Sequence, residues 1–177
     1  MSVAVGLVHK GKVYIGVDSI AVNANDGGFS LIKEPKVFTR GQFIIGYVGS
    51  FRIGQLLRHQ VKIGRVNNDV NKYLCTTFIN RLREALKAES FMNEDGMLAG
   101  NVLIGVQGRL FTVYGDWAVV EPLSGYDAIG VGTHYCLASL YTTINSEMMP
   151  EERILIALKS TETHNTNIRE PFHVISK

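Results

Sequence analysis

The chain has 177 residues, of which 46% are hydrophobic and 19% charged, and its formal net charge is +2. This length is typical of one domain, so we expect a single domain over residues 1–177. Scattered Lys and Arg residues and near-neutral charge argue against a nucleic-acid partner. No segment has the ~20 apolar residues that span a bilayer, and none is typical of a signal sequence. We therefore expect a cytoplasmic protein with no nucleic-acid or membrane partner.

The first part of the chain has strand patterns. Alternating apolar residues on both sides of Lys10-Gly11-Lys12 predict a β-hairpin. An Asn- and Gly-rich loop over 23–28 then precedes a second pair of strands, which turns at Arg40-Gly41. The strands predicted here are 3–7, 13–17, 20–22, 36–39 and 42–48.

Two helices are predicted next. The first runs from Phe51 to about Ile63, with Phe51, Ile53, Leu56 and Leu57 on one side. The second begins after a cap at 67–69 and carries apolar residues at spacings of three and four as far as Leu86. The two cysteines of the chain, Cys75 and Cys136, fall within helical patterns, and we interpret both as buried small hydrophobic residues. We expect no disulfide, no metal and no cofactor.

The remaining elements repeat the same order. Strands return, two more helices follow, and a final strand ends the chain. The predicted strands are 101–106, 110–114, 117–120, 127–130 and 171–176, and the predicted helices are 133–144 and one that begins at Pro150. Blocks of strands that alternate with pairs of helices do not suit βαβ winding. They predict an α+β protein in which two antiparallel sheets stack face to face and helices cover the outer faces, a four-layer αββα sandwich.

Ser2 is the first candidate functional residue. Removal of Met1 would place a hydroxyl and a free α-amine on this one residue, which gives a nucleophile and its base. The ordinary pKa of an α-amine, about 7.7–8.0, suits a general base near neutral pH. Asp18, Lys36 and Gly49, each at the end of a strand pattern, are the other candidates. Taken singly, each has an ordinary interpretation as a turn residue, a solvated charge or a helix start.

In this order and spacing, these residues resemble the proteasome β-subunit family and its bacterial relative HslV, which are N-terminal nucleophile hydrolases. The resemblance covers nearly the whole chain. It is carried by Ser2 to Ser19, by Lys36-Val37, by Val48-Gly49-Ser50 and by Ala128-Ile129-Gly130-Val131-Gly132. The family fold is an αββα sandwich, in agreement with the element order.

The resemblance implies a role for each residue. Ser2 would attack, and its freed amine would act as base. Lys36 would place a positive charge beside the nucleophile, which lowers the pKa of the hydroxyl. Asp18 would pair with Lys36, and the Gly49 N–H would stabilise the oxyanion. It also implies a peptide or unfolded-protein substrate, a homo-oligomeric ring and an ATP-dependent unfoldase as partner. Ala21, Asn23 and Phe51 are the pocket walls it implies.

The sequence departs from the family at three places. Serine stands where the family nucleophile is usually threonine, and Val131 replaces a turn serine. Glu162 and Asn165 occupy the positions of an Asp and a Ser near the final turn. We therefore take Thr133, Glu162 and Asn165 as candidate supporting residues.

Three functions follow from this interpretation. The first is a peptidase that acts through Ser2. The second is an inactive ring-forming or scaffold protein with the same fold, which Val131 and a retained Met1 would favour. The third is an amidase that acts on a small molecule.

Overall fold

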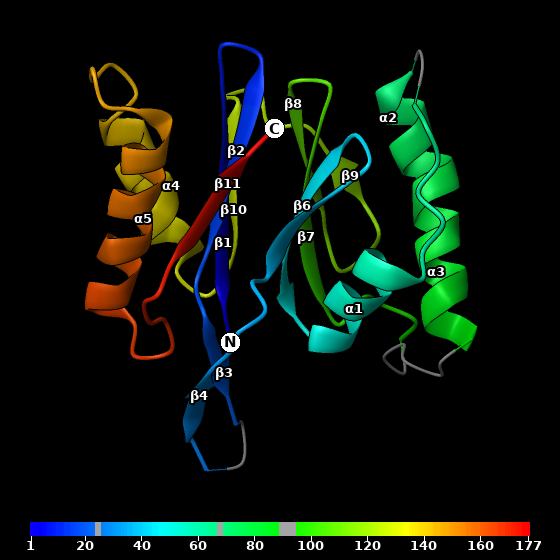
Figure 1. Ribbon diagram of the computed structural model, residues 1–177, viewed down its shortest axis with the longest axis horizontal. Coiled ribbons are helices and arrows are strands. Elements are labelled where there is room, and N and C mark those ends of the chain that lie inside the picture. The colour runs from blue at the N-terminus through cyan, green and yellow to red at the C-terminus, as the bar shows by residue number, and fades with distance from the viewer. Residues whose placement is uncertain (24–25, 67–68, 89–94) are drawn as a thin grey trace.

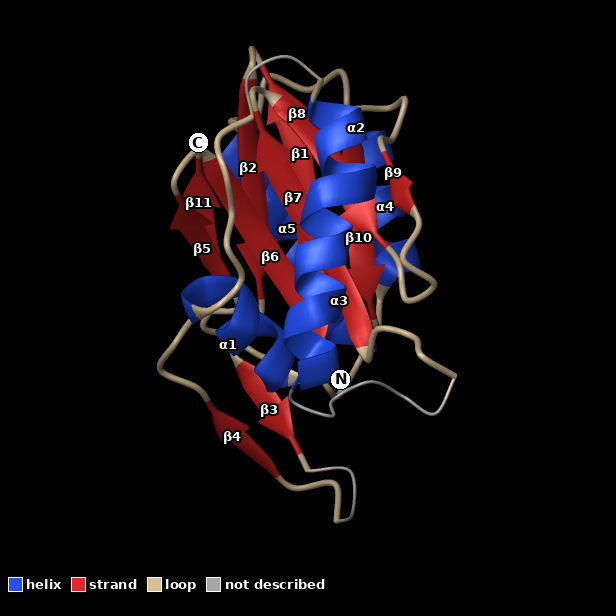
Figure 2. Cartoon of the chain, turned by 90° about the vertical axis from the view of Figure 1, so that its right-hand side faces the viewer, coloured by secondary structure: helices blue, strands red, loops and turns tan. Residues whose placement is uncertain are grey.

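The computed structural model describes residues 1–23, 26–66, 69–88 and 95–177. Two larger antiparallel sheets stack face to face, and helices cover the outer face of each (Figure 1). A short third sheet, the β3–β4 hairpin, projects at the end where the chain begins (Figure 2). This is the arrangement of an α+β sandwich. In the described part of the chain, no helix is long and apolar enough to cross a membrane.

The first sheet has the strand order β10-β1-β2-β11. Its strands are β1 (Val3–His9), β2 (Lys12–Val17), β10 (Tyr126–Gly130) and β11 (His173–Ser176). The predicted hairpin forms because β1 and β2 pair in register from Ala4↔Val17 to His9↔Lys12. Helices α4 (Thr133–Thr142) and α5 (Pro150–His164) lie on its outer face (Figure 1).

The second sheet has the order β5-β6-β7-β8-β9. Its strands are β5 (Val37–Arg40), β6 (Phe43–Gly49), β7 (Gly100–Val106), β8 (Arg109–Val113) and β9 (Val119–Val120). Its outer face is covered by α1 (Phe51–His59), α2 (Val70–Tyr73), the π-helical segment η1 (Leu74–Phe78) and α3 (Ile79–Ala88). The small hairpin consists of β3 (Ile20–Val22) and β4 (Phe29–Leu31).

Apolar side chains fill the three spaces between these layers. One cluster lies between the two sheets and includes Ile15, Ile44 and Leu103. A second joins α4 and α5 to the first sheet, and a third joins α1 and α3 to the second sheet. Because successive side chains of a strand point to opposite sides of the sheet, each strand contributes apolar side chains to both of its faces.

Several sequence expectations need correction. Cys75 is exposed, whereas Cys136 is buried as expected. The flanking Leu74 and Phe78 face the core, so Cys75 points outward and its thiol contacts Asn71 Oδ1 at 3.3 Å. The predicted second helix contains the π-helical segment η1, which its apolar spacing did not indicate.

Several predicted elements are shorter than expected. Helix α4 ends at Thr142 rather than 144, and β11 begins at His173 rather than 171. Helix α1 ends at His59 rather than near Ile63, and Phe51 at its start is 37% exposed rather than buried with its neighbours. The strand predicted over 117–120 is reduced to β9, because Trp117 adopts a φ of +72° within a turn. The cap predicted at 67–69 is Asp69, whose carboxylate accepts from the Lys72 N–H, whereas 67 and 68 lie outside the described residues.

Candidate active site

Ser2, Asp18 and Lys36 meet in a buried cluster at one end of the sandwich. Ser2 directly precedes β1, Asp18 directly follows β2, and Lys36 directly precedes β5. The first two residues therefore come from one sheet and the third from the other. All three are almost fully buried, with exposed fractions of 5%, 0% and 1%. The sandwich fold brings together groups that are separated by up to 34 residues in sequence.

Lys36 is the centre of this cluster. Its Nζ donates to Ser2 Oγ at 2.8 Å, to Asp18 Oδ2 at 2.8 Å and to the Ile20 carbonyl at 2.6 Å. A lysine ammonium has three N–H donors, so these bonds use its whole donor capacity. Burial lowers the pKa of Lys36 below its ordinary value of 10.5, and the Asp18 carboxylate opposes that shift. The result is a fixed cationic donor aimed at the serine oxygen.

Asp18 ties the cluster to the backbone. Its Oδ1 accepts from the Val3 N–H at 2.9 Å, and its Oδ2 accepts from the Ile20 N–H at 3.0 Å. A carboxylate that is paired and hydrogen-bonded in this way is tolerated in the interior. Asp18 therefore holds both Lys36 and the residue that follows Ser2.

The Ser2 carbonyl is held from the other side. The Val131 N–H donates to it at 2.9 Å. Gly130 makes this approach feasible, because its φ is +93° and a Cβ at this position would lie 2.1 Å from the Ser2 oxygen. The side chain of Val131 supplies no hydroxyl, but its backbone N–H fixes Ser2.

The Ser2 hydroxyl has a further partner. It donates to the Met1 carbonyl at 2.7 Å while its oxygen accepts from Lys36. In the chain that retains Met1, the α-amine belongs to Met1 and not to Ser2. The cluster thus contains a hydroxyl and a cation, and removal of Met1 would place a free α-amine on the same residue as the hydroxyl.

Gly49 ends β6 near this cluster. The preceding Val48 lies beside Gly130, with its Cγ1 3.2 Å from the position a Cβ would take there. Gly49 itself has a φ of +94°, and a Cβ would lie 2.3 Å from the Ala99 carbonyl oxygen. Glycine is therefore required by the fold at this position.

The three candidate supporting residues form hydrogen bonds elsewhere. Thr133 Oγ1 donates to the Gly130 carbonyl. Glu162 Oε1 accepts from the Glu170 N–H, and Asn165 Oδ1 accepts from the Asn167 N–H. Within the described residues, none of the three has a hydrogen bond to Ser2, Asp18 or Lys36, and a supporting role for them stays a prediction.

Two cavities lie near the cluster. Phe51, whose ring centroid is 5.9 Å from Lys36 Nζ, lines one of about 280 Å³ together with Ile32, Lys33, Glu34, Tyr47 and Gln55. Ala21 and Asn23 line another of about 250 Å³. Burial raises the pKa of Tyr47 to about 12, so its hydroxyl stays neutral near physiological pH.

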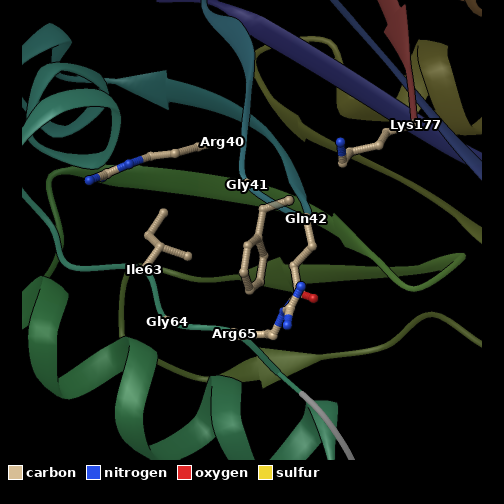
Figure 3. A pocket seen from close by; sticks show the side chains of 8 residues that line it. Arg40, Gly41, Gln42, Ile63, Gly64, Arg65 and Lys177 are labelled. Carbon is tan, nitrogen blue, oxygen red and sulfur yellow. The ribbon is translucent and has the colours of Figure 1, made fainter.

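A larger cavity of about 500 Å³ lies at the opposite end of the sandwich, beside Lys177, which pairs with Val13 (Figure 1). Its basic residues do not converge, since Arg40, Arg65 and Lys177 lie on different sides of the opening (Figure 3). Arg40 Nη1 donates to the Leu57 carbonyl at 2.6 Å, so this charge is directed at α1. In the described part of the chain, no group of three or more His, Cys, Asp and Glu residues could hold a metal ion.

Sequence reasoning missed the backbone partners of this site. The Ile20 carbonyl, the Met1 carbonyl and the Val131 N–H all contact the cluster. Because any residue type carries these atoms, no sequence signal could have identified them. The Ser19 hydroxyl, next to Asp18, is buried without a hydrogen-bond partner among the described residues and takes no part in the contacts of the cluster.

No family model matches the sequence, and no curated protein sequence matches it. Solved structures do resemble it. BPH from Thiobacillus denitrificans in complex with epoxomicin has a TM-score of 0.84 and 18% identity, over 99% of this chain and 97% of that chain. HslV from Trypanosoma brucei has a TM-score of 0.71 and 16% identity, over 98% of each chain.

Anbu (ancestral beta-subunit) from Yersinia bercovieri has a TM-score of 0.70 and 19% identity, over 99% of this chain and 81% of that chain. Identities this low establish the fold alone. The chain therefore has a proteasome-like fold of the HslV type.

Proposed function

We propose that this chain is a proteasome-like peptidase that hydrolyses peptide bonds through Ser2 after the removal of Met1. The observation that carries the proposal is the position of Lys36 Nζ, 2.8 Å from Ser2 Oγ and 2.8 Å from Asp18 Oδ2 in a buried cluster. A serine hydroxyl is a weak nucleophile unless a neighbouring group activates it. The fixed cation and the freed α-amine would together supply that activation.

In the proposed mechanism the Ser2 α-amine takes the hydroxyl proton as Oγ attacks the substrate carbonyl carbon. The Gly49 N–H would bind the resulting oxyanion, a contribution of about 2.7–4 kcal/mol for one such donor. Collapse of the tetrahedral intermediate breaks the C–N bond, and the protonated amine of Ser2 returns the proton to the leaving amine. Water then hydrolyses the ester on Ser2, with the same amine as base. Lys36 stays protonated and favours the neutral form of the amine.

The decisive experiment compares wild type, Ser2→Ala and a control variant on fluorogenic peptides, with intact-mass analysis of each N-terminus. Ser19→Ala is a matched control, because it removes another buried hydroxyl next to Asp18. We expect Ser2→Ala to lower kcat by about 10³-fold or more, and Ser19→Ala to retain turnover. Equal turnover by wild type and Ser2→Ala would reject the mechanism.

Epoxomicin provides a second test of the same site. A peptide epoxyketone has a ketone to which a hydroxyl can add and an epoxide that a neighbouring amine can open. We expect Ser2 to be labelled, with a gain of the whole inhibitor mass, only in chains that have lost Met1. Labelling of Met1-bearing chains to the same extent would argue against the α-amine as a participant.

A second candidate is a non-catalytic scaffold, and one observation favours it. In this structure the Ser2 hydroxyl donates to the Met1 carbonyl, and the Thr133 hydroxyl donates to Gly130 rather than to Ser2. A chain that keeps Met1 in its native cell and shows no turnover would support this candidate.

We also propose that the protein assembles as a homo-oligomeric ring and receives unfolded substrates from an ATP-dependent unfoldase. Exposed apolar side chains on and after α4, among them Tyr141 and Ile144, support an assembled state. Sedimentation velocity measures this directly, and a monomer at all concentrations would contradict it.

A further inference from the structure

Arg58, on the last turn of α1, holds the segment that carries Lys36. Its Nη2 donates to the Pro35 carbonyl at 2.6 Å, and its Nε lies 3.3 Å from Glu34 Oε1. Its guanidinium also stacks 4.2 Å from the centre of the Phe38 ring. Arg58 therefore contacts residues on both sides of Lys36.

The contacted segment is the connection between the β3–β4 hairpin and β5. It has no regular secondary structure over 32–36, and Pro35 has no backbone N–H with which to join the sheet. Beyond this segment, the Tyr47 N–H donates to the Lys36 carbonyl at 3.1 Å and so ties Lys36 to β6. Arg58 joins the segment just before Lys36 to the helix layer through a hydrogen bond to Pro35 and an ion pair with Glu34.

A second arginine contacts α1 from β5, in the opposite direction to Arg58. Arg40, at the end of β5, donates to the Leu57 carbonyl of α1 at 2.6 Å. The residues Arg40 and Arg58 thus fasten α1 to the two ends of β5. Helix α1 begins at Phe51, two residues after Gly49. Its N-cap is Ser50, whose hydroxyl accepts from the Arg52 N–H at 3.1 Å. One short helix therefore connects the lysine segment with the glycine at the end of β6.

We propose that Arg58 is a positioning residue that sets the place of Lys36 relative to Ser2, with α1 as the rigid support. The catalytic consequence rests on the proposed function, whereas the positioning itself is a property of the fold. Arg58 acts by geometry. The charges that shift the pKa of Lys36 come from Asp18, and the largest cause of that shift is burial. A planar guanidinium suits the role, because its fixed fork can serve a carbonyl, a carboxylate and a ring at once.

The test uses Arg58→Gln and Arg58→Lys, with Arg81→Gln as control. Arg81 is an arginine of the same general kind, since its Nη1 donates to the Lys62 carbonyl at 2.8 Å, but it lies on α3 and holds a different loop. The first measurement is the pKa of Lys36 by NMR of ¹³C-labelled lysine, with the signal assigned by its loss in Lys36→Met. The second measurement is kcat and KM on a fluorogenic peptide.

In Arg58→Gln we expect the loosened segment to admit water, so the pKa of Lys36 rises toward 10.5. We expect kcat to fall by about 10- to 100-fold with little change in KM, because a shift of about 1 Å in a catalytic group has effects of this size. Arg58→Lys should restore part of both, since lysine keeps the positive charge and a hydrogen-bond donor group but lacks the planar fork. Arg81→Gln should match wild type in both measurements.

The two measurements separate the two proposals. If the wild type has no turnover, the peptidase proposal fails, and the Lys36 pKa still decides whether Arg58 positions the lysine. If the wild type cleaves and a folded Arg58→Gln leaves both kcat and the Lys36 pKa unchanged, the positioning role is overturned and the peptidase remains. If Arg58→Gln does not fold, Arg58→Lys takes its place, and an unchanged pKa and kcat in that variant overturn the role.

Discussion

The two ends of the sandwich differ in what makes a site. At one end, Ser2, Asp18 and Lys36 form a dense buried cluster in which each group contacts another. At the other end, a cavity of about 500 Å³ is bordered by arginine and lysine side chains that point apart (Figure 3). The larger cavity is the weaker candidate for an active site, because catalysis needs functional groups that converge on one point rather than a large volume.

The two ends of the sandwich also differ in how deeply their charged side chains are buried. Lys36 is 1% exposed and depends on Asp18, whereas Arg65 and Lys177 at the larger cavity are exposed to solvent. Interactions at an exposed site are weakened by water, and a buried ion is costly when its partner is removed. The two ends should therefore respond very differently to substitution.

The largest effect is expected from Lys36→Met. This change leaves the Asp18 carboxylate buried without its cation, which costs about 3–5 kcal/mol of unfolding free energy. Turnover should also fall by about 100-fold or more. Urea denaturation and peptide assays measure the two effects.

A double variant is the control for this result. Asp18→Asn added to Lys36→Met removes the unpaired charge, so the double variant should be more stable than Lys36→Met alone. Equal stability of wild type and Lys36→Met would show that the buried cluster is no more sensitive to substitution than the exposed residues at the larger cavity.

A smaller effect is expected from pH. Burial lowers the pKa of Lys36 in the folded state, so between that pKa and 10.5 the unfolded chain binds more protons than the folded chain. The unfolding free energy should therefore rise with pH across this window, relative to Lys36→Met, by at most about 1.4 kcal/mol per pH unit. Urea titrations at a series of pH values from 7 to 10.5 provide the measurement. A difference that falls as the pH rises would contradict this expectation.

The smallest effect is expected at the other end of the molecule. Arg65→Ala and Lys177→Ala, alone or together, should change the unfolding free energy by less than about 0.5 kcal/mol and leave turnover unchanged. Both side chains are exposed and serve no convergent site (Figure 3). A marked loss of turnover in either variant would show that the larger cavity takes part in the reaction.

Local pattern predicted much of the fold. The β1–β2 hairpin and its turn follow from alternation and a Lys-Gly-Lys sequence, because both signals lie within neighbouring residues. The predictions failed where the packing around a residue, rather than its local sequence pattern, determines its burial or its backbone conformation. Cys75 shares a helical segment with buried residues but faces outward, and Trp117 sits in a turn because the chain bends there before β9.

The site was predictable only in its side chains. Ser2, Asp18 and Lys36 could be proposed because their order and spacing resemble those of the proteasome β-subunit family, and the structure brings them together. Their backbone partners and Arg58 could not, because those contacts depend on how α1 packs beside β5 and on how β10 meets the start of β1. Long-range packing of this kind leaves no pattern in a single sequence.

The double restraint on the backbone around Ser2 has a consequence for how the protein would mature. The Asp18 carboxylate accepts from the Val3 N–H, and the Val131 N–H donates to the Ser2 carbonyl, so neither hydrogen bond involves Met1. Excision of Met1 would leave these two backbone restraints intact. It would remove the Met1 carbonyl from the Ser2 hydroxyl, to which Lys36 Nζ would still donate. The backbone of the new terminal residue would therefore already be held in place, and we expect no rearrangement of β1 after Met1 is removed.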